Sequence, residues 1–107
     1  MNYNVEATAY FARQLKRLLK KYPSLKIEIS QLIELLELHP QQGTAIGNHC
    51  YKIRLSISSK GKGKSGGARI ITHVYILRKT VYLLSVYDKS EQDNIPQLLI
   101  ETLISEL

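Results

Sequence analysis

The sequence predicts an α+β fold, in which an N-terminal helical hairpin packs on a small, mainly antiparallel sheet and a short helix follows at the C-terminus. Apolar residues recur at three- and four-residue steps between residues 8 and 39, which is typical of amphipathic helices. After residue 50 the period changes to two, which is typical of strands. Both patterns fit within 107 residues, of which 44% are hydrophobic, so we expect a single domain over residues 1–107.

Two helices are expected to form the hairpin, after a short first strand at residues 2–7. The first helix begins at about Thr8 and ends before Pro23, because the residue before a proline is pushed away from helical angles. The second begins after Ser24, whose side chain is a candidate N-cap, and ends at His39-Pro40. Each helix has one apolar stripe, made by Phe11, Leu15, Leu18, Leu19 and Tyr22 in the first and by Leu25, Ile29, Leu32, Ile33 and Leu36 in the second.

Three strands are expected to form an antiparallel meander after a loop over residues 41–48. Alternating residues predict strands at 51–58, 68–77 and 81–87, and residues 78–80 form the tight connection between the last two. With both helices on one face of the sheet, we expect the other face to carry the basic residues. A last helix begins near Pro96 and runs to the end of the chain.

Positive charge is concentrated in the middle of the chain. The sequence has 15 Lys and Arg against 9 Asp and Glu, a net charge of +6. Residues 49–89 hold nine of the basic residues and one acidic residue, Asp88, whereas residues 90–107 hold four acidic residues and no Lys or Arg. The excess therefore lies on the predicted strands and their loops, which indicates an acidic partner such as nucleic acid, an anionic surface or an acidic protein.

Several classes of protein are excluded by what the sequence lacks. The single cysteine, Cys50, cannot form an internal disulfide or a cysteine-rich zinc site. No cluster of His, Asp and Glu has metal-ligand spacing, so we expect no metal and no cofactor. The first residues do not resemble a signal peptide, and no apolar run reaches the roughly 20 residues that a membrane helix needs. We therefore expect a cytoplasmic protein with no membrane partner.

The segment Lys60-Gly61-Lys62-Gly63-Lys64-Ser65-Gly66-Gly67 resembles a phosphate-binding loop only superficially. A P-loop needs a glycine where this chain has Ser58, and it needs a helix next, whereas residues 68–72 predict a strand. Nucleotide hydrolysis is therefore not expected. Two interpretations stay open: a solvated hairpin tip, or a contact with a nucleic-acid backbone, which glycines favour by letting the main chain approach a phosphate.

The predicted basic face also carries an aromatic residue. Lys52 and Arg54 leave the same face of their strand, Arg69 follows on the next strand, and Tyr87 and Lys89 end the last one. Cations for phosphates and an aromatic ring for a base suit RNA, although a tyrosine half-buried at the end of a sheet is an alternative. His73 shares its parity with Arg69 and could face the same site, but the pattern favours a packed strand histidine.

Three segments resemble a known family of proteins. They are Tyr51-Lys52-Ile53-Arg54, Lys60 to Ile71 with its "GKGK" and "RII" runs, and Tyr82 to Glu91, with the pattern "LLSVYDKSE". In this order they resemble the RelE/ParE superfamily of bacterial toxins, and within it the HigB-like toxins, over about residues 49–95. The helical hairpin before them fits the family's order of elements.

The resemblance implies a RelE-like fold and the toxin half of a type II toxin–antitoxin pair. Most such toxins are endoribonucleases that cut mRNA in the ribosomal A site without a metal, and a cognate antitoxin silences them. The implied partners are therefore this antitoxin, in a hetero-oligomer, and mRNA on the ribosome. The candidate catalytic residues are Arg69, Tyr87, Lys89 and Lys64, and the candidate RNA-binding residues are Lys52, Arg54, Lys60, Lys62 and His73.

Metal-free RNA cleavage requires the 2′-hydroxyl to attack the neighbouring phosphate while the protein moves protons and balances charge. We expect Arg69, with Lys64 or Lys62, to stabilise the charge on phosphorus. Lys52 or Lys89 would act in proton transfer, because neighbouring cations lower the pKa of a lysine. Tyr87 would orient or stack a base, or act as an acid. Two alternatives remain: a ParE-like gyrase poison, and a non-catalytic RNA- or ribosome-binding degenerate toxin.

Overall fold

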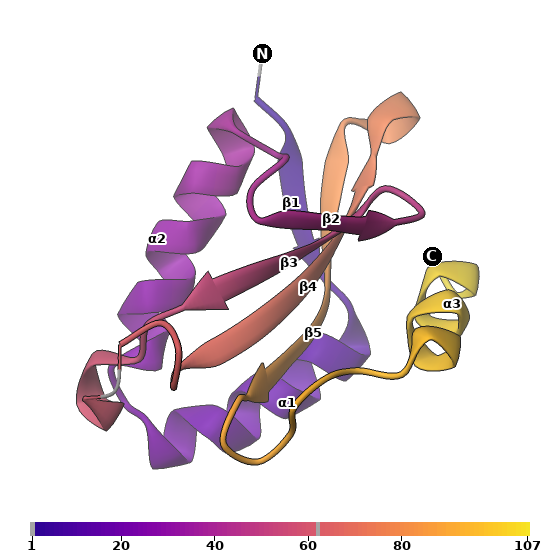
Figure 1. Cartoon of the computed structure of the whole chain (residues 1–107). Helices are drawn as coiled ribbons and strands as arrows, with labels where there is room; N and C mark the ends of the chain where they lie inside the picture. The colour runs from indigo at the N-terminus through magenta and orange to yellow at the C-terminus, as the bar shows by residue number, and fades with distance from the viewer. Residues whose placement is uncertain (1, 62) are drawn as a thin grey trace.

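The computed structural model describes residues 2–61 and 63–107 and shows three α-helices and a five-stranded sheet (Figure 1). The elements in chain order are β1 (Asn4–Ala7), α1 (Ala9–Lys21), α2 (Leu25–Leu38), β2 (Thr44–Gly47), β3 (Cys50–Leu55), the 3-10 turn η1 (Ser58–Lys60), β4 (Ala68–Tyr75), the 3-10 turn η2 (Ile76–Arg78), β5 (Thr80–Asp88) and α3 (Gln97–Ser105). The predicted α+β class, helical hairpin, sheet and C-terminal helix are confirmed.

The sheet has the strand order β1-β5-β4-β3-β2. The predicted meander is present, because β3, β4 and β5 pair antiparallel in sequence order, and β1 adds to the outside of β5 in parallel. Between β4 and β5 the register shifts by one residue, since Ile71 lies opposite Ser85 and Thr72 opposite Leu83. Leu84 is thus the extra residue of a bulge, which increases the local twist of the sheet.

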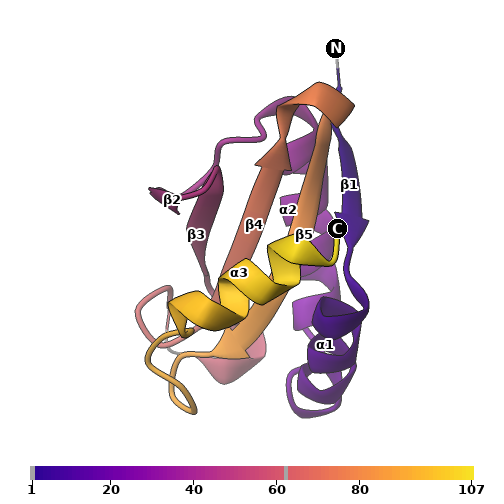
Figure 2. The same ribbon diagram turned by 90° about the vertical axis from the view of Figure 1, so that its right-hand side faces the viewer.

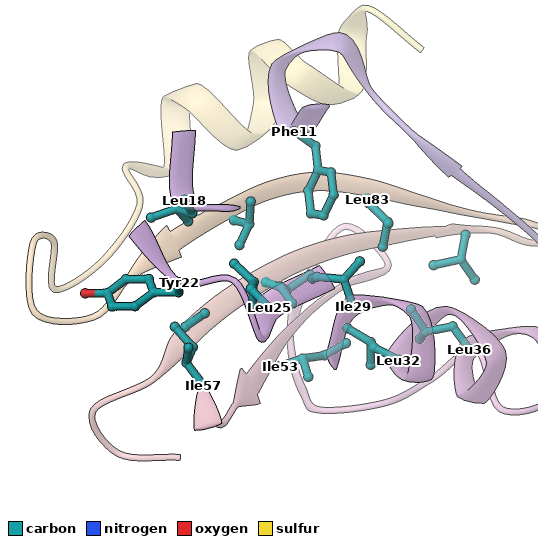
Figure 3. Close-up of a cluster of buried hydrophobic side chains, with 14 of the residues drawn as sticks. Phe11, Leu18, Tyr22, Leu25, Ile29, Leu32, Leu36, Ile53, Ile57 and Leu83 are labelled. Atoms are coloured by element: carbon teal, nitrogen blue, oxygen red, sulfur yellow. The ribbon is translucent and has the colours of Figure 1, made fainter. Parts of the chain in front are cut away.

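The main core lies between the sheet and the first two helices (Figure 3). Phe11 and Leu18 of α1 and Leu25 and Leu36 of α2 are at most 1% exposed and pack on sheet residues such as Leu83. Burying a side chain of this size contributes about 1.5–3 kcal/mol, so these apolar stripes hold both helices against one face. The Thr8 hydroxyl caps α1 by accepting a hydrogen bond from the Phe11 amide at 3.1 Å.

A second, smaller core lies on the opposite face of the sheet. Figure 2 shows α3 crossing in front of the strands, whereas α2 lies behind them. Ile100 and Leu103 of α3 join Ile71 and Leu84 of the sheet in one buried cluster. The expectation that this face carries the basic residues is therefore correct only in part, because α3 and its apolar cluster cover much of it.

The structure corrects several local predictions. Residues 44–47 form β2 rather than loop, and β2 pairs with β3. The strand expected at 51–58 ends at Leu55, and that expected at 68–77 ends at Tyr75, because a 3-10 turn follows each. Ser24 makes no N-cap hydrogen bond, since its hydroxyl contacts Glu28 and Ser59 instead.

Within residues 2–61 and 63–107, none of the helices has the length and apolarity required to cross a membrane.

Candidate nucleic-acid interface

Three of the predicted site residues form one row across the sheet. Arg54 of β3 is in register with Arg69 of β4, which is in register with Tyr87 of β5. Their neighbours Ile53, Ile70 and Val86 pack in the core against α1 and α2. Because successive strand residues face opposite sides, the row lies on the other face of the sheet, beside α3.

Arg69 is buried, with 5% exposure, and its guanidinium holds the loop that precedes β4. It donates hydrogen bonds to the carbonyl oxygens of Lys64 at 2.8 Å, Ala68 at 3.2 Å and Ser65 at 3.3 Å. These neutral partners satisfy the donors without cancelling the charge. Arg69 therefore both fixes the Lys64 loop and places a positive charge beneath it.

Two lysines, Lys52 and Lys64, accompany Arg54 at the β3 end of this row. Lys52 is half-buried on β3, and the side chains of Arg54 and Lys64 are exposed. No carboxylate of residues 2–61 or 63–107 pairs with any of these three residues or with Arg69. A group of four cations without a paired anion produces a positive potential that attracts phosphate.

Tyr87 lies at the β5 end of the row and is 2% exposed. It belongs to the apolar cluster beneath α3, and its hydroxyl has no hydrogen-bond partner among residues 2–61 and 63–107. Burial raises the pKa of the phenol, and the charge of Arg69 offsets this shift only in part. A buried hydroxyl without a partner is uncommon and is often associated with function.

The segment between β5 and α3 contacts two of the predicted lysines. Lys89 Nζ pairs with the Asp93 carboxylate at 3.0 Å and donates to the Asp93 carbonyl at 3.1 Å. Lys52 Nζ donates to Asn94 Oδ1 at 3.0 Å. The sequence predicts no role for Asp93 or Asn94, and the acidic composition of residues 90–107 is the only signal that points to this segment.

Lys60 is used differently from the prediction that it binds RNA from a mobile cationic loop. Its side chain is 8% exposed and forms an ion pair with Asp88, which is fully buried. Asp88 also accepts hydrogen bonds from the Tyr22 hydroxyl at 2.7 Å and from the amide and hydroxyl of Ser90. Burial alone would raise the pKa of Asp88, but the hydrogen bonds from Lys60, Tyr22 and Ser90 outweigh it and hold the pKa well below its usual range.

This cluster joins three parts of the chain: the end of α1, η1 and the end of β5. Asp88 lies between Tyr87 and Lys89, so it fixes the backbone from which both project. Asp88 is the single acidic residue among residues 49–89, and this isolation among basic residues is the sequence signal for a buried ion pair.

We call the row of Arg54, Arg69 and Tyr87 the cationic row. His73 does not lie in it. It is in register with Cys50 and Tyr82, further along β4, and the pair Lys52 and Ile71 lies in between. Burial lowers the pKa of His73, and its Nδ1 lies 3.5 Å from the Cys50 sulfur. Cys50 is 1% exposed, as expected for a structural thiol. Lys62, also predicted to bind RNA, lies outside the described residues.

Residues 2–61 and 63–107 contain no group of three or more His, Cys, Asp and Glu side chains arranged to hold a metal ion. The interface itself presents ammonium and guanidinium cations, a phenol and hydrogen-bonding amides. They can bind phosphate, donate protons and stabilise negative charge.

The comparison with known proteins identifies the type of fold. No protein-family model matches the sequence. The arrangement of helices and strands, in contrast, is similar to that of solved RelE toxins, so the chain has the RelE-type α+β fold that the sequence resemblance implies.

Individual structures give the extent of this similarity. An arginine double mutant of the E. coli toxin RelE in the free state matches with a TM-score of 0.64 and 17% identity, over 100% of this chain and 99% of that chain. The isolated E. coli RelE toxin matches with a TM-score of 0.58 and 18% identity, over 98% of this chain and 99% of that chain. The toxin–antitoxin complex RelBE2 from Mycobacterium tuberculosis has a chain that matches with a TM-score of 0.56 and 16% identity, over 82% of this chain and 92% of that chain.

Proposed function

We propose that the chain is the toxin of a type II toxin–antitoxin pair and acts in the cytoplasm as a ribosome-dependent, metal-independent endoribonuclease on mRNA in the A site. The observation that carries the proposal is the row of Arg54, Arg69 and Tyr87, with Lys52 and Lys64 beside it, in a fold shared with RelE toxins. The motifs that resemble HigB-like toxins contribute all five of these residues.

The phosphate is held by the cations at the β3 end of the row. Arg54 can form two parallel hydrogen bonds to a phosphate, and Lys52 and Lys64 add positive charge on either side. As the 2′-hydroxyl attacks, negative charge grows on the phosphate oxygens, and fixed cations stabilise that charge more than they stabilise the ground state. Arg69 contributes from below by fixing the Lys64 loop, so it is a positioning residue as well as a source of charge.

Proton transfer falls to Tyr87 and a lysine. The raised pKa of Tyr87 keeps its phenol protonated at neutral pH, which suits donation to the leaving 5′-oxygen rather than removal of a proton. RNA reaches this hydroxyl only after the apolar residues that bury it move aside. The proton of the 2′-hydroxyl must go to a neutral amine, so the lysine that accepts it does not also serve as a cation at the phosphate. Lys52 and Lys89 are the candidates, and both are held by hydrogen bonds to residues 93 and 94. If Lys52 is the acceptor, Arg54, Arg69 and Lys64 supply the positive charge.

The ribosome and the antitoxin complete the proposal. A protein whose candidate acid, Tyr87, is buried depends on the ribosome to hold mRNA in line for attack. An antitoxin with an acidic segment would neutralise the toxin by covering the unpaired cations Lys52, Arg54 and Lys64.

Inducible expression of the chain alone, followed by mapping of cellular mRNA 5′ ends, tests the proposal. We expect growth arrest and cuts in the reading frame of translated messages, with untranslated copies of the same messages intact. Growth arrest with intact mRNA and altered plasmid supercoiling would instead identify a gyrase poison. Ribosome association without cuts would identify a non-catalytic binding protein.

A further inference from the structure

A groove opens at the edge of the sheet next to the cationic row. Its volume is about 650 Å³, and it lies between α2 and β3. Its lining includes the three cations Lys52, Arg54 and Lys64, and also Gln31, Leu35 and Gln42. A volume of this size is within the range of small-molecule and nucleotide sites.

The groove exists because β2 covers only part of β3. Pairing between the two strands ends at Thr44, which lies opposite Lys52, so the sheet edge from Ile53 to Leu55 has no strand beyond it. Gly43 turns the chain away at this point with φ of +92°, and a Cβ there would lie 2.3 Å from the Lys52 carbonyl oxygen. This turn needs a glycine and leaves the edge open.

The lining of the groove matches a nucleotide in charge. Lys52, Arg54 and Lys64 have no paired carboxylate among the described residues. The single acidic residue of the lining, Glu28, is already engaged, because one of its oxygens accepts from the Ser58 amide at 2.7 Å and from the Ser58 hydroxyl at 2.6 Å. The groove therefore favours an anionic occupant.

The lining also offers groups that can recognise a base. Within residues 2–61 and 63–107, the amides of Gln31 and Gln42 make no hydrogen bond, so their donors and acceptors are free for a ligand. Leu35 is 42% exposed and gives an apolar surface for the face of a base. Single-stranded RNA is recognised by this combination of stacking and hydrogen bonds to the edges of unpaired bases.

We propose that the groove is a nucleotide subsite, in which Lys52, Arg54 and Lys64 hold the backbone and Gln31 and Gln42 read the base next to the cleaved phosphate. The inference rests on the proposed ribonuclease function and adds a determinant of base preference to it. The two glutamines are specificity residues, and the cleavage chemistry remains with the cationic row.

The test uses the purified full-length chain, a Gln31→Ala, Gln42→Ala double variant and a Gln97→Ala control. Gln97 is an exposed glutamine on α3 that does not line the groove. Circular dichroism verifies folding, which we expect to be retained because neither groove amide makes an internal hydrogen bond. Two properties are measured for each protein: cleavage of ribosome-bound mRNAs that differ only in the A-site codon, and binding of short RNA oligonucleotides made uncleavable by a 2′-deoxy central nucleotide.

We expect the wild type and Gln97→Ala to discriminate between bases at one position by about tenfold in both assays. In the double variant this preference should fall to about twofold in both assays. Loss of the oligonucleotide preference in the double variant supports the subsite even if no mRNA is cut. The absence of any mRNA cut would overturn the proposed ribonuclease function alone. Unchanged base preference in a double variant that still cuts mRNA would overturn the subsite and leave the ribonuclease function intact.

Discussion

Arg54 of β3 lies directly opposite Arg69 of β4, and no carboxylate of the described residues pairs with either guanidinium. Like charges at directly opposed positions of an antiparallel sheet are destabilising. A ligand that binds only the folded chain stabilises it, so a phosphate between or above the two residues would offset the repulsion.

Replacing Arg54 by glutamine should therefore separate stability from activity. We expect the free energy of unfolding of Arg54→Gln to be unchanged or up to about 1 kcal/mol higher, because the repulsion with Arg69 is removed. Cleavage of ribosome-bound mRNA should fall by about 10²-fold, since one cation at the phosphate is lost. Urea unfolding and a primer-extension cleavage assay measure the two effects.

Lys26→Gln is the matched control, because Lys26 is an exposed cation on α2 outside the groove. It removes the same net charge and should leave both properties unchanged. Equal losses of cleavage in the two variants would show that only net charge matters, which contradicts a specific site at Arg54.

Much of this arrangement could be predicted from the sequence. The alternation of Lys52 and Arg54 with apolar residues and the position of Arg69 at the start of its strand correctly put cations on one face of the sheet. The alternation of apolar and polar residues could not predict β2, because residues 44–47 are few and alternate weakly. They become a strand by pairing with β3.

Two other features depend on tertiary contacts that no local pattern encodes. Lys60 belongs to a run of lysines and glycines that is typical of a solvated loop, yet the buried carboxylate of Asp88 binds it. The burial of Tyr87 depends on where α3 docks, and the apolar stripe of α3 does not specify which strands it covers. The groove glutamines are equally invisible in the sequence, because they come from α2 and from the loop before β2.

The Tyr87 hydroxyl should matter for activity but not for folding. This buried hydroxyl has no partner in the part of the chain that the structure describes, so Tyr87→Phe removes an unsatisfied polar group. We expect the free energy of unfolding to stay constant or to rise by about 1 kcal/mol. Cleavage should fall by about 10²-fold if the phenol donates a proton. Thermal unfolding and the cleavage assay on ribosome-bound mRNA measure the two effects. Wild-type cleavage by Tyr87→Phe would remove Tyr87 from the proton-transfer step.

The buried Asp88 should make stability depend on acid. Its pKa is lower in the folded than in the unfolded chain, so it stabilises the fold above the unfolded value of about 4, and this contribution is lost as the pH falls from there toward the folded pKa. At pH 7, Asp88→Asn should lower the free energy of unfolding by about 3 kcal/mol, because it leaves Lys60 buried without its partner. The difference from the wild type should shrink as the pH is lowered through 4.

Urea unfolding at several pH values checks this prediction, with Asp93→Asn as the control. The Asp93 side chain is 95% exposed, so its loss should change the free energy of unfolding by less than about 0.5 kcal/mol. A pH-independent difference between Asp88→Asn and the wild type would contradict the assignment of the acid sensitivity to Asp88.

Cys50 offers a probe of the face beneath α3. Burial raises the pKa of its thiol to about 11, and the side chain is 1% exposed. We expect a thiol reagent at pH 8 to label the folded protein at least about 10²-fold more slowly than the protein in urea, because the thiolate is the reactive species. Labelling of the folded chain as fast as in urea would show that α3 does not protect this face.

The central claim is that the cationic row cleaves mRNA only on the ribosome. The most direct measurement incubates the purified chain with one mRNA, either free or bound to ribosomes with an empty A site, and maps the new 5′ ends. We predict a single cut within the A-site codon of the ribosome-bound message, no cut in the free message, and loss of the cut in Arg54→Gln. An intact message on the ribosome, or an equal cut by Arg54→Gln, would contradict the account.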